Sequence, residues 1–203
     1  MRIAVFASGG GSNFQAIADA CLDESIPAEV ACCIASRPDA GVIERAKKME
    51  IDVHVLSSHP EGLAGEMLRV LAEYNVDLIA LAGFMTMIPE SVVRLYRNRI
   101  LNVHPALLPD FGGKGMYGMN VHRAVIESGA AVSGATIHLV DEEYDTGAIV
   151  LQESVEVNNS DRPEDLAARV LLVEHRLYPR AIALFAKNMV QVKGRHVEIS
   201  DLD

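Results

Sequence analysis

The sequence predicts an α/β protein with a doubly wound, mostly parallel central sheet flanked by helices. Short runs rich in β-branched and other apolar residues alternate with stretches of helical periodicity. Units of that kind require right-handed crossovers between parallel strands. The run at residues 76–83 is almost continuously apolar, as expected of a central strand buried on both faces. A glycine-rich turn at residues 8–13 separates the first strand from the first helix.

The first half of the chain supplies four strands and three helices. We expect strands at residues 2–7, 29–35, 52–56 and 76–83. We expect helices from residue 14 to residue 21, where Phe14, Ile17, Ala18 and Cys21 follow helical spacing, and at residues 40–49 and 60–74.

The second half begins with a strand that should end at Pro105, because proline cannot donate to a sheet ladder. A long loop with four glycines follows, up to Asn120. The expected elements beyond it are a helix at 121–128, a strand at 132–140, an acidic turn at 141–147, a strand at 148–155, a helix at 163–187 and a hairpin at 190–199 around Gly194.

Composition bounds the class of protein. The 203 residues are 50% hydrophobic and 23% charged, which fits one globular domain with a full core. No apolar run approaches the ~18 residues that a membrane span needs, and the start of the chain has no signal-peptide pattern. The net charge of -10 argues against a nucleic-acid-binding protein. Three cysteines without metal-ligand spacing indicate buried thiols in a reducing cytoplasm.

The glycine-rich turn has the layout of a phosphate site, because free backbone N–H groups and the helix dipole attract an anion. Ser12 or Asn13 is a natural N-cap for the following helix. A dinucleotide fingerprint would need a third glycine where Phe14 stands and a carboxylate after the second strand. The sequence therefore favours a phosphate monoester, with an NADP-dependent reductase (suggested by Arg37) and a ligand-free turn as the alternatives.

Asn102 and His104 lie two residues apart at the end of the strand that precedes Pro105, so their side chains share one face. Open α/β sheets place their ligand crevices at the carboxyl ends of strands. An amide donor beside an imidazole could stabilise an oxyanion. The alternative is a polar pair that only caps the strand.

Two further segments have two interpretations each. The loop around Gly112–Gly118 is either a lid or binding loop, or a surface loop. The apolar residues 84–88 could line a pocket for a flat ring or belong to the core. The acidic turn at 141–147 lacks the spacing of a calcium loop.

Taken together, the motifs resemble the phosphoribosylglycinamide formyltransferase family, which catalyses the folate-dependent third step of purine synthesis. Four stretches match in order, SGGGSN at Ser8, LAGFM at Leu81, NVHPALLP at Asn102 and HLVDEEYDTGAIVLQ at His138, and a fifth match is Glu174-His175 with Tyr178-Pro179. The resemblance spans essentially the whole chain. It implies a Rossmann-like formyltransferase fold in a single domain, residues 1–203, with a phosphosubstrate-binding half at about 1–100 and a catalytic and folate-binding half at about 101–203.

The resemblance also implies roles for individual residues. The catalytic residues would be Asn102, a protonated His104 and Asp145, whose charge would favour the imidazolium. The substrate phosphate would be held by Gly10, Gly11, Ser12 and Asn13, and the ribose and glycinamide part by Glu174. The folate would contact Met85, Thr86, Met87, Ile88, Asn102, Val140, Asp141 and Asp145.

The substrates implied are glycinamide ribonucleotide and the co-substrate 10-formyltetrahydrofolate, with no metal, nucleic acid or membrane as partner, in a cytoplasmic monomer or homodimer. The chain departs from the family at Thr86, where many members carry a basic residue near the folate glutamate tail, and in its longer Gly112–Gly118 loop.

Three rivals remain as expectations. Formyltetrahydrofolate deformylase usually has an extra N-terminal domain, and methionyl-tRNA formyltransferase a C-terminal RNA-binding domain; we expect neither here. A non-catalytic phosphosugar or nucleotide sensor could use the glycine turn, but the joint presence of Asn102, His104 and Asp145 argues against it.

Overall fold

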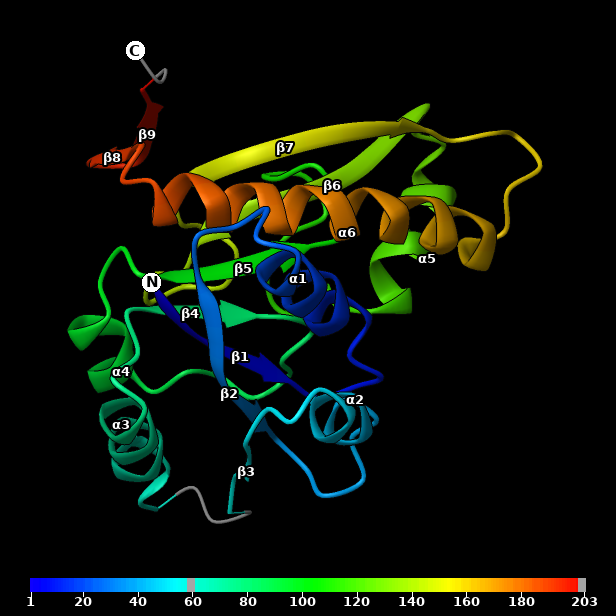
Figure 1. Cartoon of the computed structure of the whole chain (residues 1–203). Helices are drawn as coiled ribbons and strands as arrows, with labels where there is room; N and C mark the ends of the chain where they lie inside the picture. Colours follow the sequence, from blue (N-terminus) through cyan, green and yellow to red (C-terminus); the bar gives the residue numbers. More distant parts are fainter. Residues whose placement is uncertain (58–60, 201–203) are drawn as a thin grey trace. The chain divides into compact units, whose positions relative to one another are not determined.

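The α/β class is confirmed in a computed structural model, which describes residues 1–57 and 61–200. Seven strands form the main sheet in the order β3-β2-β1-β4-β5-β6-β7 (Figure 1). The chain divides into two compact units, Met1–Asn102 and Val103–Asp203.

The first unit is built on parallel strands, β1 (Arg2–Ala7), β2 (Glu29–Ala35), β3 (Val53–Val55) and β4 (Leu78–Leu81). β1 pairs in parallel with β2 and with β4, and β2 pairs in parallel with β3. Every residue of β4 is buried, in agreement with its continuous apolar pattern. The predicted strands are all present, although β3 and β4 are shorter than expected at their ends.

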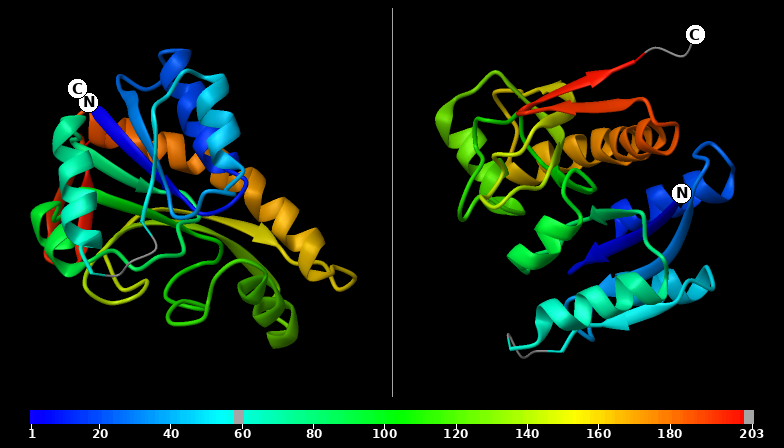
Figure 2. Two further views of the ribbon diagram at one scale, coloured as in Figure 1. Left: turned by 90° about the horizontal axis from the view of Figure 1, so that it is seen from below. Right: turned by 90° about the vertical axis from the view of Figure 1, so that its left-hand side faces the viewer.

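Helices α1 (Ser12–Leu22) and α2 (Val42–Lys48) pack side by side, as do α3 (Leu63–Glu73) and α4 (Glu90–Leu95) (Figure 2). The first three were predicted. The expected start of α3 at Pro60 lies outside the described residues. The short helix α4 was not predicted, because six residues are too few to show a clear helical period.

Strand β5 (Ile100–His104) ends at the residue before Pro105, as predicted, and pairs in parallel with β4. The division between the two units falls inside this strand, between Asn102 and Val103.

The second unit contains the antiparallel pair β6 (Val132–Leu139) and β7 (Ile149–Glu156), with helix α6 (Pro163–Ala186) lying along both (Figure 1). Helix α5 (Met119–Ser128) packs on α6 and begins two residues earlier than predicted. The predicted terminal hairpin is present as β8 (Val190–Lys193) and β9 (His196–Ile199).

The cysteines follow the prediction in two cases out of three. Cys32 and Cys33 on β2 are buried, whereas Cys21 near the end of α1 is partly exposed. Burial raises the pKa of the Cys32 and Cys33 thiols to about 12 and that of Cys21 to about 11. The thiols therefore stay protonated at neutral pH and are poor nucleophiles. In the described ranges, no helix combines the length and apolar character that crossing a membrane would require.

Candidate active site

In the first unit, the glycine turn after β1 leads directly into α1. The N-cap is Gly11 in the left-handed conformation, with φ of 76°, so the expectation of Ser12 or Asn13 at this position is wrong. Glycine is selected there because a side chain would be strained and would meet Val42 at 2.7 Å. The first turn of α1 has no acidic residue and its N-cap supplies no side-chain hydrogen bond. The N–H groups at the start of α1 have no acceptor within the helix and can therefore bind an anion.

The carbonyl oxygens of this turn face protein donors. Val42 N donates to Gly9 O (3.0 Å), and Arg45 Nε donates to Gly10 O (2.7 Å). Gln15 N donates to Gly11 O (2.9 Å). With its carbonyls held in this way, the turn has a fixed backbone, and the Arg45 guanidinium adds a positive charge beside it.

We expect Gly11→Ala to lower the thermal midpoint of unfolding clearly more than Gly10→Ala. A Cβ at Gly11 would sit at positive φ against the backbone of Val42, whereas one at Gly10 would meet nothing within 4 Å. Strain of this kind costs on the order of 1–3 kcal/mol. Thermal melts of the two variants and of the wild type measure the difference between their midpoints. Equal midpoints would contradict the close approach at Gly11.

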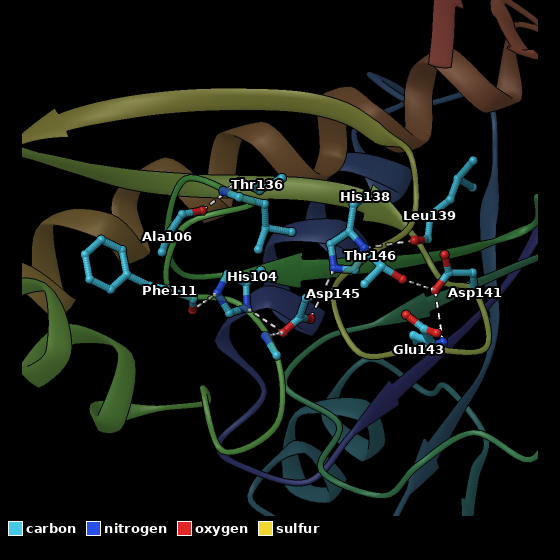
Figure 3. Close-up of polar contacts among 12 residues, drawn as sticks. His104, Ala106, Phe111, Thr136, His138, Leu139, Asp141, Glu143, Asp145 and Thr146 are labelled. Carbon is cyan, nitrogen blue, oxygen red and sulfur yellow. Dashed lines mark hydrogen bonds and ion pairs between the residues drawn. The ribbon is translucent and has the colours of Figure 1, made fainter. Parts of the chain in front are cut away.

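In the second unit, His104 ends β5 and its side chain is only 3% exposed. Its Nε2 donates to the carbonyl oxygen of Phe111 at 2.8 Å, which places the ring proton of the neutral imidazole on Nε2. The other nitrogen, Nδ1, faces Asp145 Oδ2 at 3.6 Å (Figure 3). That separation exceeds a normal hydrogen bond, so the two groups attract each other as charges only when the His104 ring is protonated.

Asp145 lies in the loop between β6 and β7, with φ of 57°. Oδ2 accepts a 2.9 Å hydrogen bond from Gly113 N, and Oδ1 lies 3.6 Å from Nε2 of His138, a residue of β6 that is 2% exposed. The carboxylate therefore sits between two buried imidazoles (Figure 3). Burial alone would raise its pKa, but His138, the Gly113 N–H and the charge of His104 outweigh burial and lower it. Asp145 is ionised at neutral pH.

Two histidines of this unit are held neutral. Burial lowers the pKa of His104 more than the Asp145 carboxylate and the Phe111 carbonyl raise it. Burial likewise lowers the pKa of His122 on α5, and the positive charge that His104 gains on protonation lowers it further. Within the described residues, Nδ1 of His122 has no hydrogen-bond partner. Protonation of either ring therefore works against the folded state.

We expect the free energy of unfolding to fall as the pH falls below about 6.5, the unperturbed histidine pKa. The unfolded chain then binds protons that the folded chain excludes, so the folded state loses up to about 1.4 kcal/mol per pH unit for each such histidine. His122→Gln removes one of these groups and should reduce the change in the free energy of unfolding per pH unit. Urea unfolding between pH 7.5 and 5.5 measures this pH dependence. A slope identical to that of the wild type would show that His122 has the same pKa in both states.

The remaining predicted site residues are placed as follows. Asn102 is half-buried on β5, two residues before His104 and on the same side of the strand. Glu174 is buried on α6. Met85 and Met87 are each 56% exposed in the segment after β4, and Ile88 is buried. Val140 and Asp141 are half-buried in the loop after β6.

Four members of the site were not predicted. The Phe111 carbonyl and the Gly113 N–H are backbone groups, which no residue type signals. His138 gave one weak signal, because it shares a strand face with Thr136. Arg45 belongs to a helix with ordinary surface charges, and only the folded turn shows that it contacts Gly10.

Comparisons with known proteins identify the family of this chain. A family model described as formyl transferase matches residues 1–182. The chloroplastic phosphoribosylglycinamide formyltransferase of Arabidopsis thaliana is 46% identical over 195 residues, 94% of this chain and 67% of the relative. The phosphoribosylglycinamide formyltransferase of Escherichia coli is 36% identical over 196 residues, 95% of this chain and 90% of the relative. The chain belongs to the phosphoribosylglycinamide formyltransferase family.

A solved structure supports the same family. Glycinamide ribonucleotide transformylase 1 from Symbiobacterium toebii superimposes with a TM-score of 0.93 at 40% identity, over 99% of this chain and 94% of that one. The chain spans about two thirds of the length of the plant relative and nine tenths of the length of the Escherichia coli relative.

Proposed function

We propose that this chain transfers the formyl group of 10-formyltetrahydrofolate to the amine of glycinamide ribonucleotide in purine biosynthesis. The observation that carries the proposal is the buried pair of His104 and Asp145 at the carboxyl end of β5, in a chain of this family. The products are formylglycinamide ribonucleotide and tetrahydrofolate. The three free cysteines fit a reducing compartment such as the cytoplasm.

In the proposed reaction, the substrate amine attacks the formyl carbon and the formyl oxygen becomes negatively charged. The Asn102 amide donates to this oxyanion, and the His104 ring stabilises it through its positive charge once protonated, because its Nε2–H is already donated to the Phe111 carbonyl. His104 is neutral in the ligand-free structure, which differs from the expectation of a protonated ring. The attacking amine releases a proton, the nearby oxyanion raises the proton affinity of the ring, and the Asp145 carboxylate facing Nδ1 stabilises the imidazolium that forms when the ring takes up this proton. The intermediate then collapses: the bond from the formyl carbon to the folate nitrogen breaks, and the proton passes to that nitrogen to give tetrahydrofolate.

In this proposal, the amides of Gly10, Gly11, Ser12 and Asn13 bind the phosphate of glycinamide ribonucleotide, with the Arg45 charge beside them. Glu174 contacts the ribose and glycinamide part of that substrate. Contacts to the folate come from Met85, Thr86, Met87, Ile88, Val140 and Asp141.

The experiment follows the absorbance of 10-formyltetrahydrofolate with and without glycinamide ribonucleotide. The proposal predicts consumption only when both are present, with one formylglycinamide ribonucleotide formed for each folate consumed. Consumption without the ribonucleotide, with release of formate, would instead identify a deformylase. Binding of the ribonucleotide without any turnover would identify a sensor. Either result overturns the proposal.

A further inference from the structure

A buried hydrogen-bond cluster that the proposed reaction does not use is centred on Thr136, in the middle of β6. Thr136 is fully buried. Its hydroxyl donates to the carbonyl oxygen of Ala106 at 2.6 Å and accepts from Leu108 N at 3.1 Å. It also accepts from Nε2 of Gln152, on β7, at 2.9 Å. A hydroxyl has one proton and two lone pairs, so Thr136 uses its full capacity.

Gln152 makes a second contact with the same turn. Its Nε2 donates to the carbonyl oxygen of Leu108 at 2.8 Å. Thr136 and Gln152 therefore hold three backbone groups of the turn that follows β5: the Ala106 carbonyl, the Leu108 N–H and the Leu108 carbonyl. Ala106 and Leu108 are themselves buried, so water cannot easily replace the two bonds that the Thr136 hydroxyl makes to their backbone.

This turn connects His104 to Phe111, whose carbonyl oxygen accepts the hydrogen bond from the His104 ring. The chain leaves β5 at His104, passes through the turn held by Thr136 and returns so that the Phe111 carbonyl accepts from His104 Nε2 (Figure 3). A backbone carbonyl can set the tautomer of an imidazole only while its own position is fixed. The turn lies beyond the end of β5, and the side chains of Thr136 and Gln152 bond its backbone on one side of Phe111, as the Gly113 N–H bond to Asp145 does on the other.

We propose that Thr136, assisted by Gln152, is a positioning residue that fixes the tautomer and orientation of His104 by anchoring the segment that carries the Phe111 carbonyl. For catalysis, this inference rests on the proposed formyl transfer. The charged and titratable groups around the His104 ring, namely Asp145, His138 and His122, are left in place by changes at Thr136.

Strand β6 offers a matched control. Ser133 is also buried, at 2% exposure, and its hydroxyl has no hydrogen-bond partner among the described residues. Ser133→Ala thus removes a buried hydroxyl from the same strand without releasing a backbone group. Thr136→Val removes the hydroxyl at nearly constant shape and releases the turn, and Thr136→Ser restores the hydroxyl.

The experiment measures kcat, the KM of each substrate and the ¹⁵N spectrum of the ligand-free histidine rings, with the His104 signal assigned from its loss in His104→Ala. Because misplacement of a reacting group by about 1 Å costs up to ~10²-fold, Thr136→Val should lower kcat by roughly 10–100-fold with little change in either KM. The His104 signal should change from the Nε2–H tautomer to a mixture. Thr136→Ser should recover most of both, and Ser133→Ala should resemble the wild type.

Gln152→Met is the second variant, needed if Thr136→Val does not fold. It removes only the donor to Leu108 and Thr136 from an exposed position of β7, and should lower kcat less than Thr136→Val while shifting the same His104 signal. An unchanged His104 signal in a folded variant would overturn the proposal, whatever its kcat. So would a kcat equal to that of Ser133→Ala. If the wild type does not transfer formyl groups, the proposed function fails, and the ligand-free spectrum still decides whether Thr136 positions His104.

Discussion

His104→Ala is expected to lower kcat for formyl transfer by about 10²–10³, or roughly 3–4 kcal/mol, the usual effect of removing one preorganised oxyanion donor. The ring is buried at the end of β5, and each of its nitrogens faces a fixed group, Phe111 O or Asp145. Alanine removes a ring that becomes charged beside the oxyanion only as the reaction proceeds, so the KM of both substrates should change little. Steady-state kinetics measures the effect.

The matched control is His196→Ala, which removes an exposed histidine from β9. Its kcat should equal that of the wild type. A near-normal kcat in His104→Ala would contradict the assignment, because none of the other described histidines lies at the end of β5.

Asp145→Asn is expected to lower kcat by at least as much as His104→Ala. The backbone of Asp145 is left-handed, a conformation that asparagine adopts readily, and the amide oxygen can still accept from Gly113 N. The variant therefore keeps the fold and loses the charge. Without that charge the buried imidazolium of His104 has no counter-ion.

Glu143→Gln removes the same charge from an exposed position on the same loop and should leave kcat unchanged. Since His104 and Asp145 would act on one transition state, the double variant should lose less than the product of the two single losses. Fully multiplicative losses would show that the two residues act independently.

The strands and the end of β5 could be predicted because their signals are local. The alternation of apolar runs gave the sheet, and Pro105 gave the carboxyl end of β5, where Asn102 and His104 lie. The helix after the glycine turn was equally clear, but its N-cap was misassigned to a polar residue. Sequence preference favours Ser or Asn at that position, whereas the close approach of Val42 requires glycine.

The rest of the site depends on contacts between distant segments. Asp145 follows His104 by forty-one positions. Its catalytic role was assigned from the family resemblance alone, because no local sequence pattern indicates it. In the structure, the Gly113 N–H and the His138 ring contact the Asp145 carboxylate, and these contacts come from segments distant in the sequence. The neutral state of His104 was also missed, because the sequence shows a carboxylate partner and does not show the extent of burial that outweighs it.

The most direct test follows a ¹³C-labelled formyl group from 10-formyltetrahydrofolate in the wild type and in the double variant His104→Ala/Asp145→Asn. In the wild type, the label should appear on the amine of glycinamide ribonucleotide. In the double variant it should stay on the folate, although calorimetry still detects binding of both ligands. Label released as formate by the wild type, or transferred at a near-normal rate by the double variant, would contradict the account.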